Sequence, residues 1–256
     1  MPDNTVYDLG FFEKEYEKWN RPEYIHPDPL EFLRHYKKPE DQEITAMIAA
    51  CLAYGNVKQI LKSVNNALSL IKDSPSMQLK HLKEEEIKRG YASFKHRFTT
   101  GEELALFLIN IKKARAEYGT LENLFIKGDN PNEETVENGL YSFVNNLNSC
   151  GRAPSLTPDP ALKSSFKRIC LFLRWMIRKD NVDLGIWEKI SPSRLIVPLD
   201  THMRQTALSL GLTKRKDTSM KTALEITAAF RRINPADPVK YDFALTRAGI
   251  RGTDEI

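Results

Sequence analysis

The sequence predicts an all-α protein, and two features of its residue pattern support this prediction. Apolar residues recur at helical spacing through most of the chain; in residues 41–52, for example, Ile44, Ile48 and Leu52 lie on one helical face. Alternation of apolar and polar residues, which marks a strand, nowhere continues beyond about five residues. The strand–helix alternation of a parallel sheet is also missing, so we expect about ten helices and few strands.

The expected helices follow one another along the chain with loops between them. After residues 41–52, the sequence Tyr54-Gly55-Asn56 indicates a turn. Further helical periodicity occurs in residues 57–71, 102–118, 135–147, 166–177, 201–210 and 220–233. Loops are expected at residues 127–132, 148–160 and 211–218. The last loop contains Lys214-Arg215-Lys216, a basic group that we interpret as solvated unless it lies beside a functional site.

Composition limits the class of protein. The chain has 256 residues, of which 41% are apolar and 28% charged, as in an ordinary globular protein. No apolar stretch approaches the roughly 20 residues that a membrane span requires. The first residues lack the basic start and apolar run of a signal peptide. We therefore expect a cytoplasmic protein that does not associate with a membrane.

The three cysteines, Cys51, Cys150 and Cys170, do not indicate a cofactor. An odd number at wide spacing does not make a disulfide framework, and no Cys-x-x-Cys pair suggests zinc or an iron–sulfur cluster. Cys51 and Cys170 lie within apolar helical segments, so we expect them to be small core residues. Neither a metal nor another cofactor is expected.

The positive charge is distributed unevenly. Residues 1–50 contain 6 Lys and Arg against 11 Asp and Glu, a balance of −5; because the whole chain carries +4, the remaining residues carry +9. A basic body favours an anionic partner, and nucleic acid is the first candidate. We expect DNA, with RNA as the alternative, bound by a monomer.

The segment with the clearest chemical potential is Val197-Pro198-Leu199-Asp200-Thr201-His202. Apolar residues and a proline lead to Asp200, and a helix-like run follows, so Asp200 is expected to cap a helix N-terminus. A carboxylate in that position is held ionised and fixed. If it faces a cleft, it can stabilise the cationic sugar that forms when an N-glycosidic bond breaks. The simpler interpretation is that Asp200 only caps the helix.

This segment resembles the one that holds the catalytic aspartate in the helix-hairpin-helix (HhH-GPD) superfamily of base-excision DNA glycosylases. Two further features occur in the same order as in those enzymes. An apolar helix at residues 43–53 ends in the turn 54–56, where the superfamily inserts a side chain into DNA, and residues 241–250 form a late helix with a glycine. The resemblance covers most of residues 41–250, and the whole chain is similar to an uncharacterised bacterial family associated with this superfamily.

The resemblance implies two helical subdomains with a cleft between them. Residues 1–40 and 191–256 would form a terminal subdomain, and residues 41–190 a central one, with Asp200 at the seam. The hairpin is expected near residues 155–178 and is degenerate. Residues 159–168 lack the glycines that let the backbone of the usual Leu-Pro-Gly-Val-Gly hairpin approach a DNA phosphate.

The resemblance also implies a lysine nucleophile in members with lyase activity. Lys167, 33 residues before Asp200 at the head of an apolar helix, is the first candidate, because its spacing is similar to that of the archaeal 8-oxoguanine glycosylases. Lys163 is the second. Such a lysine needs a lowered pKa, from partial burial or from a cationic neighbour such as Arg168. The alternative is a surface lysine on a basic helix.

Other residues are candidates for catalysis or DNA contact. His202 either assists Asp200 or makes a structural hydrogen bond, and Tyr54 either enters the DNA or packs on a neighbour. Trp175 is expected in the core rather than stacked on a base. Arg174, Arg178 and Lys179 form a basic cluster that meets phosphates or only decorates a helix surface. The expected nucleic-acid contacts are Tyr54, Asn56, Arg168, Arg174, Arg178, Lys179 and Arg204.

These features lead to three hypotheses. The first is an enzyme that flips a damaged base and cleaves its glycosidic bond, with or without cleavage of the strand at the abasic site. The second is a non-catalytic nucleic-acid-binding protein of glycosylase-like fold. The third is an enzyme of another class, in which Asp200 is only a helix cap.

Overall fold

The computed structural model describes residues 8–162 and 164–251, with side chains up to Arg247. This part of the chain is mostly helical, which confirms the all-α prediction. Its α-helices are α1 (Leu9–Trp19), α2 (Pro39–Leu52), α3 (Val57–Leu68), α4 (Pro75–His81), α5 (Glu84–Gly90), α6 (Gly101–Tyr118), α7 (Leu121–Lys127), α8 (Glu137–Leu147), α9 (Lys167–Ile177), α10 (Thr201–Ser209), α11 (Met220–Ile233) and α12 (Asp242–Arg251). The 3-10 helices are η1 (Pro22–Tyr24), η2 (Pro29–His35) and η3 (Pro192–Arg194), and strands β1 (Lys95–His96) and β2 (Thr99–Thr100) form an antiparallel hairpin.

Local sequence signals explain several helix ends. Helix α6 begins with a capping box, in which Thr100 Oγ1 accepts from the backbone of Glu103 and the Glu103 carboxylate accepts from the backbone of Thr100. It ends at Gly119, whose φ of 80° lies in the left-handed region that favours glycine. Proline occupies the first turn of α2, where its missing N–H costs no hydrogen bond.

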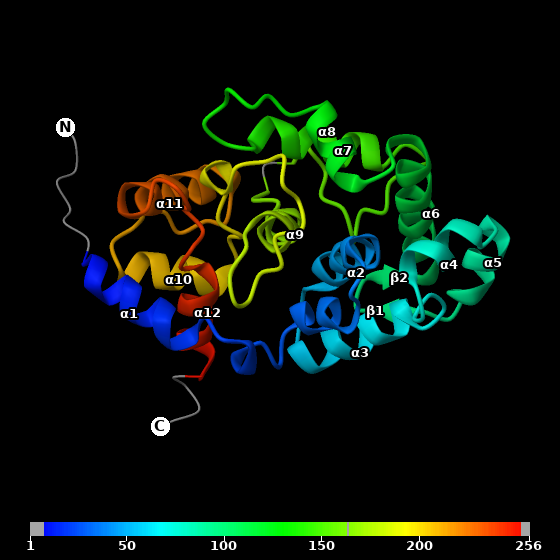
Figure 1. Cartoon of the computed structure of the whole chain (residues 1–256), viewed down its shortest axis with the longest axis horizontal. Coiled ribbons are helices and arrows are strands. Elements are labelled where there is room, and N and C mark those ends of the chain that lie inside the picture. Colours follow the sequence, from blue (N-terminus) through cyan, green and yellow to red (C-terminus); the bar gives the residue numbers. More distant parts are fainter. Residues whose placement is uncertain (1–7, 163, 252–256) are drawn as a thin grey trace.

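The helices gather into two ends with a pair of helices between them (Figure 1). Helices α1, α10, α11 and α12 lie at one end, α3 to α8 lie at the other, and α2 packs against α9 in the middle. Helix α1 lies against α12, where the Glu13 carboxylate accepts from Lys240 Nζ at 2.7 Å and from the Tyr241 hydroxyl at 2.6 Å. The N-terminal helix is thereby fastened to the C-terminal part of the chain. The predicted subdomain boundaries at residues 40 and 190 stay a prediction.

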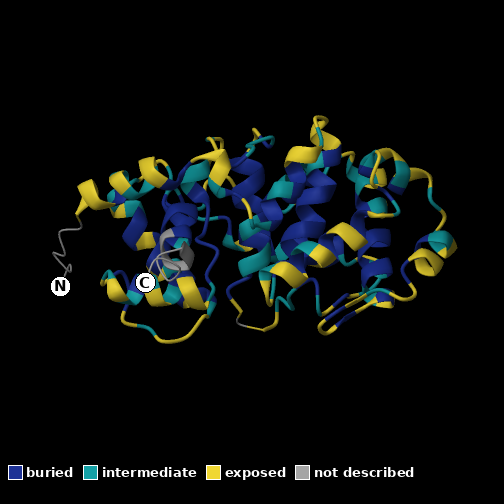
Figure 2. Ribbon diagram, turned by 90° about the horizontal axis from the view of Figure 1, so that it is seen from below, coloured by how far each residue is buried: buried dark blue, intermediate teal, exposed yellow. Residues whose placement is uncertain are grey.

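The core runs through both ends of the molecule (Figure 2). Helix α2 is buried on nearly every face because α3, α4, α9 and η2 surround it. Cys51 and Cys170 lie in this core as predicted, and burial raises the pKa of the Cys51 thiol to about 12. Trp175 is also fully buried, which agrees with its assignment to the core.

An ion-pair network lies inside the protein where the sequence suggested a surface cluster. Arg174 and Arg178 on α9 are 4% and 3% exposed. Arg178 bonds to Asp183, to Asp180 at 2.9 Å and to Asp237 at 2.8 Å. Burying a charge is costly unless it is paired, and these aspartates supply the partners. Because Arg178 is enclosed in this way, we correct its assignment as a phosphate contact.

The region of the expected degenerate hairpin, residues 155–178, contains α9 and the end of the long connection that precedes it, and the hairpin itself stays a prediction. Helix α8 ends at Leu147 and α9 begins at Lys167, and the described residues between them form turns and irregular backbone. The candidate nucleophile Lys163 falls outside the described residues. Within residues 8–162 and 164–251, no helix combines the length and the apolar character needed to span a membrane.

Candidate functional site

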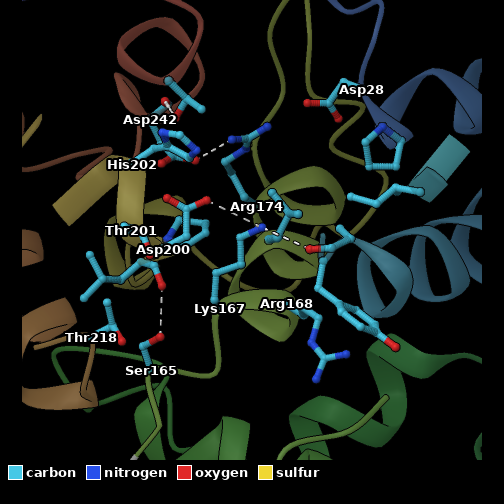
Figure 3. A pocket seen from close by; sticks show the side chains of 18 of the residues that line it. Asp28, Ser165, Lys167, Arg168, Arg174, Asp200, Thr201, His202, Thr218 and Asp242 are labelled. Atoms are coloured by element: carbon cyan, nitrogen blue, oxygen red, sulfur yellow. Dashed lines mark hydrogen bonds and ion pairs between the residues drawn. The ribbon is translucent and has the colours of Figure 1, made fainter. Parts of the chain in front are cut away.

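A pocket of about 1060 Å³ opens between elements that are far apart in the sequence. Its walls come from the loop before η2, the turn after α2, the segment leading into α9, the start of α10 and helix α12. Lys167 and Asp200 lie side by side within it (Figure 3).

Lys167 and Asp200 form the charged centre of the pocket. The Lys167 Nζ atom lies 3.8 Å from Asp200 Oδ2, and the two side chains are 26% and 34% exposed. Both groups are therefore accessible to a molecule that enters the pocket. At this separation the pair makes an ionic contact rather than a short hydrogen bond, so a ligand atom can take the place of either partner.

Asp200 is the N-cap of α10, as its sequence context predicted. Its Oδ1 atom accepts a hydrogen bond from the backbone N–H of Met203 at 2.9 Å. The other oxygen, Oδ2, is the one nearest Lys167. One carboxylate thus serves as a helix cap and as a charge in the pocket.

Lys167 is the first residue of α9, and its neighbour Arg168 reaches back to α2. The Lys167 amine donates to the Ala53 carbonyl at 3.4 Å, and Arg168 Nη1 donates to the Cys51 carbonyl at 2.7 Å. Arg168 also donates to the Ser155 carbonyl at 2.5 Å. The two basic residues satisfy carbonyls at the open C-terminal end of α2 and fix it beside α9. Arg168 has a structural role in addition to lining the pocket.

Tyr54 lines the pocket and packs against the β1–β2 hairpin, and its insertion into DNA stays a prediction. Its hydroxyl lies 2.8 Å from the His96 carbonyl and 2.6 Å from Thr99 Oγ1. Its ring meets the His96 ring edge-on at 4.5 Å, and the Arg168 guanidinium lies 5.0 Å from the ring centre. The next candidate, Asn56, caps α3 by accepting from the Lys58 backbone at 3.0 Å.

An exposed aromatic residue that sequence reasoning missed stands beside this turn. Phe98 is 75% exposed at the two-residue tip of the β1–β2 hairpin. Arg97, the other tip residue, has a φ of 51° and lies over the Phe98 ring at 5.5 Å. A Cβ atom on Gly55, which lines the pocket, would come within 2.8 Å of the Arg97 side chain. The signal was a phenylalanine among basic residues in a segment without helical periodicity.

The remaining predicted residues are divided between the pocket and its surroundings. His202 is exposed and lines the pocket, whereas Arg204 bonds to the Lys216 carbonyl and is not among the lining residues. Lys179 is exposed just after α9, where its backbone forms an isolated antiparallel β-bridge with Leu184. The basic loop of residues 211–218 reaches the pocket through Thr218, so it does lie beside the site.

Two carboxylates on the pocket wall are already paired. Asp28 accepts from Arg247 at 2.7 Å, and Asp242 accepts from Arg174, which also lines the pocket. Burial raises the pKa of Asp242, while the ion pair with Arg174 opposes that rise. In the part of the chain that the structure describes, no group of three or more His, Cys, Asp and Glu side chains is arranged to hold a metal ion.

Comparison with known proteins assigns a family without assigning a reaction. Residues 28–251 match the profile of a family described as "Protein of unknown function (DUF2400)". The match includes the described residues that line the pocket, apart from Pro27. No curated protein matches the sequence.

Proposed function

We propose that this chain, which belongs to the DUF2400 family, is a DNA glycosylase with abasic-site lyase activity. The observation that carries the proposal is the 3.8 Å contact between Lys167 and Asp200 in an open pocket. These are the two residues to which the resemblance assigns the nucleophile and the catalytic carboxylate. Residues 33 apart in the sequence have no local reason to meet in a pocket.

The proposed reaction begins with a flipped nucleotide in the pocket. The neutral Lys167 amine attacks C1′ of the deoxyribose, the bond from C1′ to the base nitrogen breaks, and the base leaves with the bonding electron pair and takes up a proton. The sugar ring then opens to give a Schiff base between Nζ and C1′. Loss of a proton from C2′ expels the 3′ phosphate, and water releases the enzyme.

Asp200 supplies the negative charge that this reaction needs. As the glycosidic bond breaks, positive charge develops on the sugar ring, and a fixed carboxylate beside C1′ lowers the energy of that state. Capping by the Met203 N–H holds one oxygen in place, so the carboxylate needs little reorganisation when charge develops. The other oxygen, Oδ2, can relay the proton that Lys167 loses to the departing base, so the carboxylate is ionised again when positive charge develops on the sugar.

Exposed basic residues around the pocket would bind the DNA backbone. Lys58 on the first turn of α3 is exposed, as are Lys95 and Arg97 on the hairpin. Lys214 and Lys216 are exposed in the loop that reaches the pocket through Thr218. Phosphate contacts of this kind supply most of the non-specific affinity for DNA. Phe98, exposed beside Arg97 at the hairpin tip, is the side chain that would stack on the opened base step.

The proposal includes a glycosylase-like arrangement of two helical subdomains around the pocket. Two observations support it. The pocket is lined by residues 27–60 and 158–247, which belong to both expected subdomains. The fastening of α1 to α12 joins the two ends of the chain, as the resemblance implies.

Base release from defined duplexes tests this function. Purified protein is incubated with end-labelled duplexes that each contain one damaged base, 8-oxoguanine among them, and the strands are then cleaved with alkali at abasic sites. We expect cleavage of at least one duplex by the native protein and cleavage about 100-fold slower by Asp200→Asn. Salt-sensitive binding of every duplex without base release would instead support the non-catalytic DNA-binding alternative.

A further inference from the structure

The backbone immediately before Lys167 forms a buried, strained corner. Ser165 and Phe166 are 5% and 2% exposed. Phe166 has φ 52° and ψ 29°, the left-handed conformation that residues other than glycine rarely adopt. Such strain persists only where surrounding contacts impose it, and it is found preferentially at functional sites.

Packing and hydrogen bonds on both sides hold this corner. The Phe166 ring meets the Tyr141 ring edge-on at 5.1 Å, and the Phe166 carbonyl accepts from the backbone of Ile169 and Cys170 as α9 begins. On the other side, Ser164 pairs with Ser219, the N-cap of α11. The corner is therefore fixed to two other elements before the chain reaches Lys167.

A side-chain hydrogen bond connects the corner to the segment that carries Asp200. The Ser165 hydroxyl donates to the backbone carbonyl of Leu199 at 3.1 Å (Figure 3). Ser165 lies two residues before Lys167, and Leu199 directly precedes Asp200. This bond therefore links the two segments within two residues of the proposed reacting groups.

The ionic contact alone would not fix the geometry of the reacting pair. Lys167 and Asp200 are partly exposed and 3.8 Å apart, and long exposed side chains hold such contacts weakly. The Ser165 bond is buried, so water does not compete with it in the way that it competes at the surface. The separation of the two backbones is thus set by a buried hydrogen bond in the wall of the pocket.

We propose that Ser165 is a positioning residue, which sets the distance between the Lys167 amine and the Asp200 carboxylate through its bond to Leu199. This inference rests on the proposed function. Without the bond, the two segments can drift apart while the pocket and the basic surface remain. A small misplacement of reacting groups lowers the rate of a chemical step far more than it lowers affinity.

The test separates chemistry from binding. Single-turnover formation of the borohydride-trapped adduct on an abasic-site duplex is compared with binding of the same duplex carrying a tetrahydrofuran analogue, which cannot form a Schiff base. For Ser165→Ala we expect a trapping rate lower by about tenfold or more, with the dissociation constant for the analogue changed by less than about twofold. The matched control is Thr157→Val, which removes a buried hydroxyl hydrogen-bonded to Asn148 in the same connection.

The possible results separate the positioning role of Ser165 from the proposed glycosylase and lyase function. A trapped adduct for the native protein, with Ser165→Ala as fast as Thr157→Val, overturns the positioning role and leaves the function standing. No adduct from the native protein overturns the function and this inference with it. If Ser165→Ala does not fold, Ser165→Cys takes its place, because a thiol has similar size but donates only weakly.

Discussion

Asp200 has two roles that its two oxygens perform separately. Oδ1 caps α10 and Oδ2 faces the Lys167 amine. The sequence predicted the cap from the residue type and the helix that follows, and the resemblance supplied the second role. The structure shows the cap and places the other oxygen against Lys167, so a substitution that keeps the cap and removes the charge can separate the cap from the proposed catalytic role.

Asp200→Asn is that substitution. Asparagine caps helices about as well as aspartate, so we expect the free energy of unfolding to change by less than about 0.5 kcal/mol. Loss of the fixed charge should lower the single-turnover rate of base release by about 100-fold. Denaturant unfolding and the rate measured on one lesion duplex check the two expectations. A normal rate in Asp200→Asn would leave the residue as a cap alone.

The sequence could identify Lys167 and Asp200 because short local signals mark both residues. Each begins a helix, and the resemblance gives their roles. It could not place Tyr54 or Arg178, because their environments come from distant segments. Tyr54 is enclosed by the hairpin around His96, and Arg178 by aspartates from beyond α9. Phe98 was missed because a two-residue strand leaves no periodic pattern.

Among the elements, the β1–β2 hairpin connects the pocket to the surface that would meet DNA. The buried His96 ring bonds to Ser63 on α3 at 2.8 Å and to the Tyr54 carbonyl at 3.1 Å. The other strand, β2, leads directly into α6. His96 thereby fixes the hairpin against the turn after α2, while Phe98 at the tip stays exposed. The hairpin is thus fixed at its base by His96 and exposes the Phe98 ring at its tip.

Phe98→Ala tests whether the exposed Phe98 ring contributes to DNA binding. Stacking of a base on an aromatic side chain contributes about 1–3 kcal/mol, so we expect duplex affinity to fall by about tenfold. The slope of affinity against salt should stay the same, because no phosphate contact is removed. Met77→Ala is the control, since Met77 on α4 is also exposed, at 49%. Equal affinities for the two variants would exclude Phe98 from the DNA contact.

His96 predicts a pH dependence of stability. Burial disfavours the charged ring and lowers its pKa below the ordinary value of 6.5. Arg97 and Arg168 act in the same direction, and hydrogen bonds to carbonyls oppose them. Between the lowered folded pKa and 6.5, the unfolded chain binds more protons, so stability falls as pH drops through this window.

Replacing His96 with a side chain that does not titrate should reduce the stability that the protein loses at low pH. We expect His96→Gln to lose less unfolding free energy than the native protein when the pH is lowered from 7.5 to 5.5. Urea unfolding at the two pH values measures the difference. A variant with the same loss as the native protein would show that His96 does not contribute.

At the scale of the whole molecule, the buried ion pairs hold α9 to the C-terminal part of the chain. Arg178 forms an ion pair with Asp237, which precedes α12, and Arg174 forms one with Asp242, the first residue of α12. Because α9 also packs on α2, it connects the two ends of the molecule that flank the pocket. Helical periodicity predicted α2, α3, α6 and α8 to α11 but not α1, whereas α4, α5 and α7 span only seven residues each and offered too few periodic positions.

Arg178→Met should therefore destabilise the protein without acting on DNA. The substitution removes one arginine from three carboxylates and leaves Asp183 with Arg174 alone, and we expect a loss of about 3 kcal/mol in the free energy of unfolding. Lys179→Met, at the adjacent exposed position, should be close to native. Below the melting temperature, duplex affinity of Arg178→Met should equal that of the native protein. A stable variant with weakened DNA binding would return Arg178 to the contact surface.

The proposed function depends on attack of the Lys167 amine, beside Asp200, on the sugar. The most direct measurement is borohydride trapping on an abasic-site duplex, followed by mass spectrometry of the cross-linked peptide, with Lys179→Ala as the control for loss of a lysine near the end of the same helix. We predict an adduct on the peptide that contains Lys167, retained in Lys179→Ala and lost in Lys167→Ala. An adduct on another lysine, or none from the native protein, would show that Lys167 is not the nucleophile.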